Sequence, residues 1–133
     1  MKKSNNSSLV LQYLATATKN IDQSLDLLHQ DIIIEYPYAE SAGLPIKIQG
    51  ENIIKDSIGE FLAQVPGLEF KNPMIYETTD PDILFATYEA EVKVTATGKI
   101  YRQKYISNFG FNDGKIIYMA EYYDPAKLKE AFT

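Results

Sequence analysis

The chain has 133 residues, of which 45% are hydrophobic and 23% charged, a composition typical of one soluble globular domain. The net charge of -5 and the scattered basic residues argue against a nucleic-acid-binding surface. The absence of cysteine excludes disulfides, thiolate metal sites and a cysteine nucleophile. No apolar run approaches the length of a membrane span, so we expect no membrane partner.

The first eight residues, MKKSNNSS, carry two lysines but lack the apolar core of a signal peptide. Residues 1–8 are therefore predicted to form a disordered lead, followed by a single domain over 9–133. A chain without a secretory signal and without cysteine fits the cytoplasm, and we expect it there.

Three helices are predicted in the first half of the chain. Apolar residues at helical spacing mark the first, namely Leu9, Val10, Tyr13, Leu14 and Ala17. A short second helix follows with Asp22 as its N-cap, and the only histidine, His29, is expected at its end. The third helix is predicted from about Glu51 to the Pro66-Gly67 stop.

Strands dominate the rest of the sequence. The β-branched and aromatic segment DIIIEYPY, residues 31–38, predicts one strand that Pro37 ends. A meander of strands is predicted over 68–76, 84–94, 101–111 and 116–124, with a short helix from Pro125. The second of these alternates apolar and charged residues, as a half-buried antiparallel strand does. We therefore expect an α+β fold in which three N-terminal helices pack on a strongly curved antiparallel sheet.

The last strand is apolar on both of its faces. Helices that cover one face leave the other exposed, and exposed apolar surface of that size usually has a partner. We therefore expect a homodimer through the outer face of the sheet.

Glu121 is the carboxylate in the interior of this last strand, and its direction depends on the preceding turn. If Asp113-Gly114 alone forms a two-residue loop, Glu121 shares the outer face with Arg102, Lys104 and Ile106. If Asn112 joins a three-residue loop, the register shifts by one and every side chain changes face. Glu121 then lies opposite Tyr105, on the inner face. The apolar pattern favours this second register.

Several strings resemble the SnoaL-like branch of the nuclear transport factor two superfamily: DIIIEYPYAESAGLP, IQGENIIKDSIGEFL and IYRQKYISNFGFNDGKIIYMAEYYDP. This branch includes polyketide cyclases, phenazine-biosynthesis A/B-type proteins and relatives of ketosteroid isomerase. The resemblance covers most of the chain and implies a conical α+β barrel with an apolar pocket, usually dimeric. It also implies an acidic residue on the last strand that faces the pocket, which here is Glu121.

The comparison with ketosteroid isomerase implies that this particular activity is absent. A helix-one tyrosine of that enzyme matches Tyr13, but its general-base aspartate falls on Tyr36 and its second oxyanion-hole acid on Ser107. A tyrosine is too weak an acid to serve as that base near neutral pH.

The resemblance and the pattern together predict a pocket lined by Tyr13, Tyr36, Tyr88, Tyr105, Ser107, Met119 and Tyr123. Burial there would raise the pKa of Glu121 and make it a general acid or base. We expect the pocket to bind a small apolar molecule, cyclic or enolisable, and to isomerise or cyclise it without metal or cofactor. The alternative is a non-catalytic ligand-binding or dimeric interaction module of the same fold.

Overall fold

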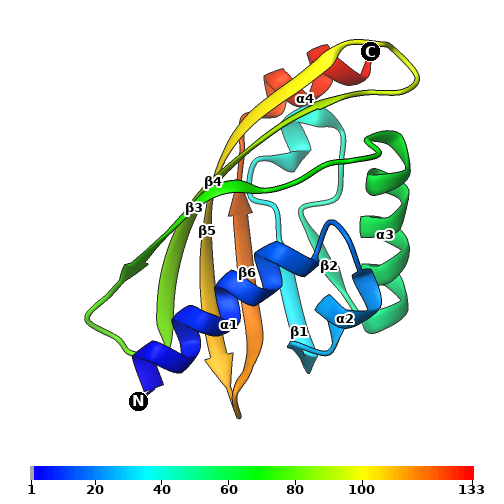
Figure 1. The fold of residues 1–133 in the computed structure, drawn as a ribbon. Helices are drawn as coiled ribbons and strands as arrows, with labels where there is room; N and C mark the ends of the chain where they lie inside the picture. Colours follow the sequence, from blue (N-terminus) through cyan, green and yellow to red (C-terminus); the bar gives the residue numbers. More distant parts are fainter. Residues whose placement is uncertain (1) are drawn as a thin grey trace.

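The computed structural model describes residues 2–133 and folds them into one sheet with helices on its inner face (Figure 1). The helices are α1 (Lys2–Thr16), α2 (Ile21–Leu25), the 3₁₀ helix η1 (Ala39–Ala42), α3 (Glu51–Gln64) and α4 (Pro125–Phe132). The strands are β1 (Leu28–Glu35), β2 (Lys47–Gln49), β3 (Lys71–Glu77), β4 (Ile83–Lys93), β5 (Ile100–Asn112) and β6 (Lys115–Tyr122). This arrangement confirms the predicted α+β class.

The six strands follow the order β2-β1-β6-β5-β4-β3 in a curved sheet that does not close on itself. β1 is parallel to β6, whereas every other neighbouring pair is antiparallel. The expectation of a purely antiparallel sheet is therefore wrong at this one junction. The two strands are far apart in the chain, so no turn signal announces their pairing. Figure 1 shows α1 crossing the concave face of the sheet, α3 standing beside it, and α4 at the other end.

The N-terminal segment differs from its prediction. α1 begins at Lys2, within the stretch 1–8 expected to be disordered, while Met1 lies outside the described residues. The reason is visible at Asn6, which is 6% exposed and donates a side-chain hydrogen bond to the carbonyl of Pro81 (3.0 Å). This contact ties the first turns of α1 to the β3–β4 loop.

The start of β1 and the N-cap of α2 also differ from their predictions. β1 starts at Leu28, so His29 lies in a strand instead of at a helix end, and its Nδ1 accepts a hydrogen bond from the amide of Asp31 (3.0 Å). The N-cap of α2 is Asn20, not Asp22, because the Asn20 side chain accepts the bond from the Gln23 amide.

The core lies between the helices and the inner face of the sheet. Val10 and Tyr13 of α1 are buried as their spacing predicted, and the Tyr13 ring meets Phe109 of β5 edge to face at 6.4 Å. Buried inner-face residues of β5 alternate with exposed or half-buried ones along its whole length. Each large apolar side chain buried here contributes about 1.5–3 kcal/mol to the free energy of unfolding.

The β5–β6 hairpin decides which residues of β6 face inward. Its loop is Asp113-Gly114 alone, both with positive φ (52° and 73°), as a two-residue type I′ turn requires. The expected three-residue loop is therefore wrong. A β-bulge follows, because Phe111 pairs with Ile116 while Gly110 pairs with Tyr118, which leaves Ile117 as the extra residue.

The bulge restores the inward register that the turn alone would lose. Ile116 and Met119, three residues apart, are both buried on the helix side, which strict alternation along a strand does not allow. Beyond the bulge, Glu121 pairs with Ser107, not with Tyr105 as expected. Gly110 permits the close approach at the bulge, since a Cβ there would lie 3.3 Å from Cβ of Tyr118.

Candidate functional site

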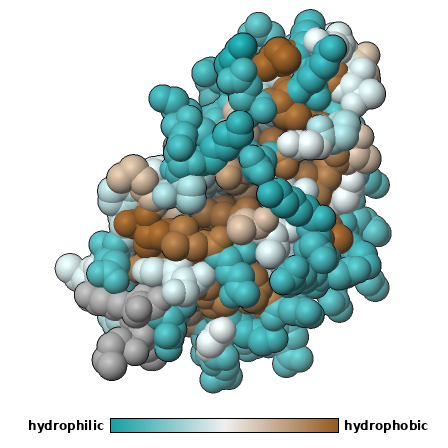
Figure 2. Space-filling view, in the orientation of Figure 1, coloured by the Kyte–Doolittle hydropathy of each residue, from teal (hydrophilic) through white to brown (hydrophobic). Residues whose placement is uncertain are grey.

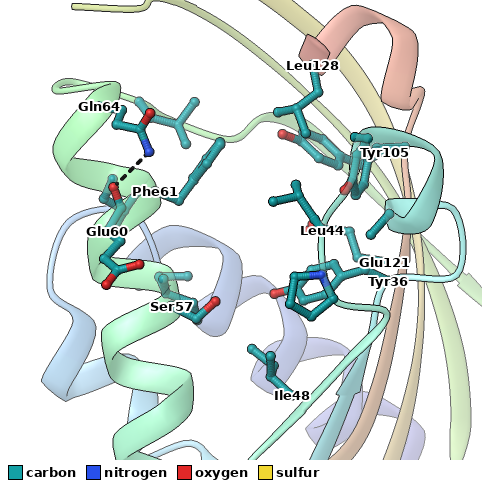
Figure 3. Close-up of a pocket in the computed structure, with 18 of the residues that line it drawn as sticks. Tyr36, Leu44, Ile48, Ser57, Glu60, Phe61, Gln64, Tyr105, Glu121 and Leu128 are labelled. Carbon is teal, nitrogen blue, oxygen red and sulfur yellow. Dashed lines mark hydrogen bonds between the residues drawn. The ribbon is translucent and has the colours of Figure 1, made fainter. Parts of the chain in front are cut away.

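A cavity of about 810 Å³ lies between α3, η1, α4 and the inner face of the sheet. Its wall is mostly apolar and aromatic, and in Figure 2 apolar side chains are visible in the region that Figure 1 shows between the sheet, α3 and α4. Figure 3 shows Glu121 and Tyr36 on the sheet side, with Ser57, Glu60 and Gln64 of α3 facing them across the space.

Glu121 reaches this cavity from β6 because of the bulge. Its Oε1 accepts a hydrogen bond from the Tyr88 hydroxyl (2.8 Å), and that hydroxyl also lies 2.6 Å from Oγ of Ser107. Within the described part of the chain, Oε2 has no hydrogen-bond partner. One carboxylate oxygen is thus anchored and the other is available to a ligand.

Burial raises the pKa of Glu121 from 4.5 to about 7, and the hydrogen bond from Tyr88 opposes this rise. Glu121 is half-buried, and the aromatic and aliphatic side chains of the cavity wall limit the hydration of its carboxylate. At neutral pH the residue can therefore either release or accept a proton, as a general acid or base does.

Tyrosines surround this carboxylate. Burial raises the pKa of Tyr13 and Tyr36 well above the usual range, and the charge of Glu121 adds to the effect. Burial also raises the pKa of Tyr123 to about 12. These phenols therefore remain protonated and serve the cavity as hydrogen-bond donors.

A sequence model of the SnoaL-like domain matches residues 10–119, which is most of the chain. The chain belongs to the SnoaL-like family. Its curved, open sheet has the fold of an ntf2-like protein from Burkholderia pseudomallei, which superposes with a TM-score of 0.81 at 17% identity over 97% of this chain and 98% of the other.

Relatives of this SnoaL-like domain come from several bacteria. The uncharacterised protein YesE of Bacillus subtilis is 32% identical over 114 residues, which cover 86% of this chain and 77% of YesE. A crystal structure of a candidate isomerase from Bacillus subtilis superposes with a TM-score of 0.89 at 29% identity, covering 99% of this chain and 95% of the other. The phenazine biosynthesis-related protein phzb2 of Pseudomonas aeruginosa superposes at 0.82 with 20% identity, covering 98% and 86%, and so shares the fold.

The SnoaL-like cavity brings together most of the residues predicted for it. Five of them line the space beside Glu121, namely Tyr13, Tyr36, Tyr105, Met119 and Tyr123. Tyr88 and Ser107 do not line it but lie behind the carboxylate, 2% and 0% exposed, where they hold Glu121 through the hydrogen bonds given above. These two are supports of the site and not contacts for a ligand.

The helix side of the cavity was missed. Asp56, Ser57, Glu60 and Gln64 of α3 line it, and none of them was among the residues predicted for the pocket. Phe61, on the apolar stripe of the same helix, lines the cavity as well. Leu128 and Phe132 of α4 also line it, and the amphipathic spacing of that helix was the only available signal.

No group of three potential metal ligands occurs among the residues that the structure describes, and none of the described helices is long and apolar enough to cross a membrane. One fully buried polar atom of the cavity wall lacks a partner within this part of the chain: Oγ1 of Thr18, in the turn that follows α1. A ligand hydroxyl or carbonyl could satisfy it.

Proposed function

We propose that this SnoaL-like protein binds a small apolar molecule, cyclic or enolisable, in the cavity and isomerises or cyclises it with Glu121 as acid and base. The observation that carries the proposal is a carboxylate with a pKa near 7 and one free oxygen, set in an apolar, tyrosine-lined cavity. The description of a relative of 29% identity as a candidate isomerase agrees with it.

The chemistry follows from the protonation state of the site. Ionised Glu121 removes a proton from carbon next to a carbonyl group, and the protonated acid then returns that proton to another position. Tyr36, Tyr123 and Tyr13 lie near the charge and can donate hydrogen bonds to the carbonyl oxygen as negative charge develops on it. No redox cofactor or nucleotide is required by this reaction.

Hydrogen–deuterium exchange into a ketone tests the proposal without knowledge of the natural substrate. A panel of cyclic enolisable ketones is incubated with the protein in D₂O, and loss of the α-proton signal is followed by NMR. We expect accelerated exchange with the wild type and at least a hundredfold slower exchange with Glu121→Gln.

Glu60→Gln is the matched control, because Glu60 lines the same cavity from the exposed face of α3. It should exchange at close to the wild-type rate. Equal rates in wild type and Glu121→Gln, with ligands still bound, would instead assign the cavity to the non-catalytic binding module.

We also propose that a second copy of the chain covers the outer face of the sheet. Met74 (56% exposed), Tyr76 (47%) and Ile106 (42%) present apolar surface there. Beside them Glu91 pairs with Arg102 at 3.5 Å. A face that carries apolar residues and both signs of charge can match itself across a two-fold axis.

A further inference from the structure

Glu121 has no basic partner in the cavity. None of the ion pairs among the described residues includes it, and no cation contributes to its pKa shift. Lys129 of α4 lines the same cavity but makes no ion pair with this carboxylate. An ionised carboxylate away from water is costly unless an opposite charge meets it. In the ionised state of Glu121, that charge is left for a ligand to supply.

Aromatic rings gather on the same side of the cavity. The ring of Tyr123 lies 6.5 Å from that of Tyr36 and 6.3 Å from that of Tyr105, and Phe70 lies 5.5 Å from Tyr105. All four rings line the cavity. Such rings attract a cation that comes within about 6 Å of their centres, and the attraction is strongest where water is excluded.

The charged residues that line the cavity also favour a cationic ligand. Asp56 and Glu60 of α3 and Glu121 of β6 face the cavity, against Lys129 as its only basic residue among those described. The chain as a whole carries a net charge of -5. A cleft lined by one sign of charge concentrates ligands of the other sign and repels those of its own.

We propose that the ligand is a protonated amine with an apolar cyclic body, whose ammonium group lies against Glu121 and the rings of Tyr36, Tyr105 and Tyr123. The aliphatic wall formed by Leu44, Ile48 and Leu128 then takes the apolar body. The inference rests on the ligand-binding part of the proposed function and does not require catalysis.

The proposal makes binding depend on pH in a definite sense. An ammonium ligand pairs with the ionised form of Glu121, so its affinity increases as pH rises through about 7. The tyrosines that face Glu121 from α1, β4, β5 and the positions directly after β1 and β6 stay neutral because burial raises their pKa. Asp56, Glu60 and Lys129 face the cavity from α3 and α4, and His29 does not line it.

A matched pair of probes separates charge from shape: 3-hydroxyphenyltrimethylammonium and its neutral isostere 3-tert-butylphenol. Both are titrated into the protein by calorimetry at pH 8 and pH 5.5. At pH 8 we expect the ammonium probe to bind at least about tenfold more tightly. At pH 5.5 this preference should fall below about threefold, because Glu121 is then protonated.

Three variants assign the effect to its residues. Glu121→Gln should remove the preference at pH 8 without changing the affinity for 3-tert-butylphenol, which also shows that the cavity is still folded. Tyr123→Leu should weaken the ammonium probe more than the phenol. Glu60→Gln, at the outer part of the cavity, should keep most of the preference.

Equal affinity of the two probes, an unchanged preference in Glu121→Gln, or no binding of either probe at millimolar concentration overturns the inference. The ketone exchange assay answers a different question. Proton exchange that depends on Glu121, without any preference for the ammonium probe, supports the proposed reaction and rejects the proposal of an amine ligand. A preference for the ammonium probe without proton exchange supports the amine ligand and rejects the proposed reaction.

Discussion

The Tyr88 hydroxyl group donates a hydrogen bond to Oε1 of Glu121 over 2.8 Å, from a strand two places away in the sheet. Because this hydrogen is engaged, Ser107 donates its own to the Tyr88 oxygen, 2.6 Å away. Tyr88 also stacks on Tyr105 at 5.0 Å, so its position is fixed by packing as well. The carboxylate is thus held from behind by buried groups on β4 and β5.

Removal of the Tyr88 hydroxyl group should raise the pKa of Glu121 further. The hydrogen bond stabilises the ionised carboxylate, so Tyr88→Phe is expected to increase the pKa by up to about one unit. NMR titration of the glutamate side-chain carboxyl carbons measures it. Ser107→Ala leaves the bond to Glu121 in place and should change the pKa less; an unchanged or lower pKa in Tyr88→Phe contradicts the geometry.

The stability of the protein should depend on the protonation of Glu121. Its folded pKa of about 7 lies above the ordinary value of 4.5, so between these values the folded protein holds a proton that the unfolded chain releases. The contribution to the free energy of unfolding is complete below pH 4.5 and is lost as pH rises through 7, by on the order of 3 kcal/mol.

Denaturant unfolding of the wild type and Glu121→Gln at pH 4.5, 6 and 8 checks this dependence. The difference between the two proteins should shift in favour of the glutamine variant as pH increases. Parallel curves across this range would show that Glu121 is hydrated as an ordinary surface carboxylate.

Gln103 should hold the junction between β6 and α4. It is 3% exposed, its Nε2 donates to the carbonyl of Asp124 (2.9 Å) and its Oε1 accepts from the Asp124 amide (3.0 Å). Gln103→Ala leaves both backbone groups of Asp124 without these partners and is expected to cost about 2–3 kcal/mol. It should also increase hydrogen exchange in α4, which closes one end of the cavity.

The matched control for this substitution is Gln49→Ala, on an exposed position of the edge strand β2. It should change the free energy of unfolding by less than about 0.5 kcal/mol. If both variants lose the same stability, the hydrogen bonds between Gln103 and the backbone of Asp124 do not contribute to the free energy of unfolding.

The outer face of the sheet should lose its partner when a charge is placed at its centre. Ile106→Lys puts an ammonium group in the proposed interface and is expected to convert a dimer to a monomer, measured by light scattering coupled to size-exclusion chromatography. Leu11→Lys places the same charge on α1, on the other side of the sheet, at a side chain that is also 42% exposed. A monomeric wild type would reject the dimer.

The elements with strong periodicity could be predicted from sequence. The inward direction of Glu121 was also predicted, but from a three-residue turn that the structure does not contain. The two-residue turn at Asp113-Gly114 was one of the alternatives considered, but the bulge at Ile117 has no local signal, because two isoleucines in a row fit either face. Pairing of β1 with β6 depends on the whole sheet and not on the sequence of either strand.

The site was predictable on its sheet side and not on its helix side. Alternation along β5 and β6 indicates which tyrosines share a face, so Tyr105 and Tyr123 were found. Alternation does not show how far a side chain lies from the cavity surface. Tyr88 was therefore expected to contact the ligand, although it lies behind Glu121. Asp56 and Glu60 belong to an exposed helix face, and only the distance of α3 from the sheet turns them into cavity residues.

The single extra residue in β6 has a consequence for how the direction of the acid is kept. If Ile117 paired in step with Gly110, every later residue of β6 would move by one position and Glu121 would lie opposite Ile106, on the outer face. Deletion of Ile117 would instead remove the bulge and leave Glu121 opposite Ser107, still facing the cavity. Within this hairpin, one residue more or less between the turn and the acid can therefore be absorbed at the bulge without loss of the cavity carboxylate.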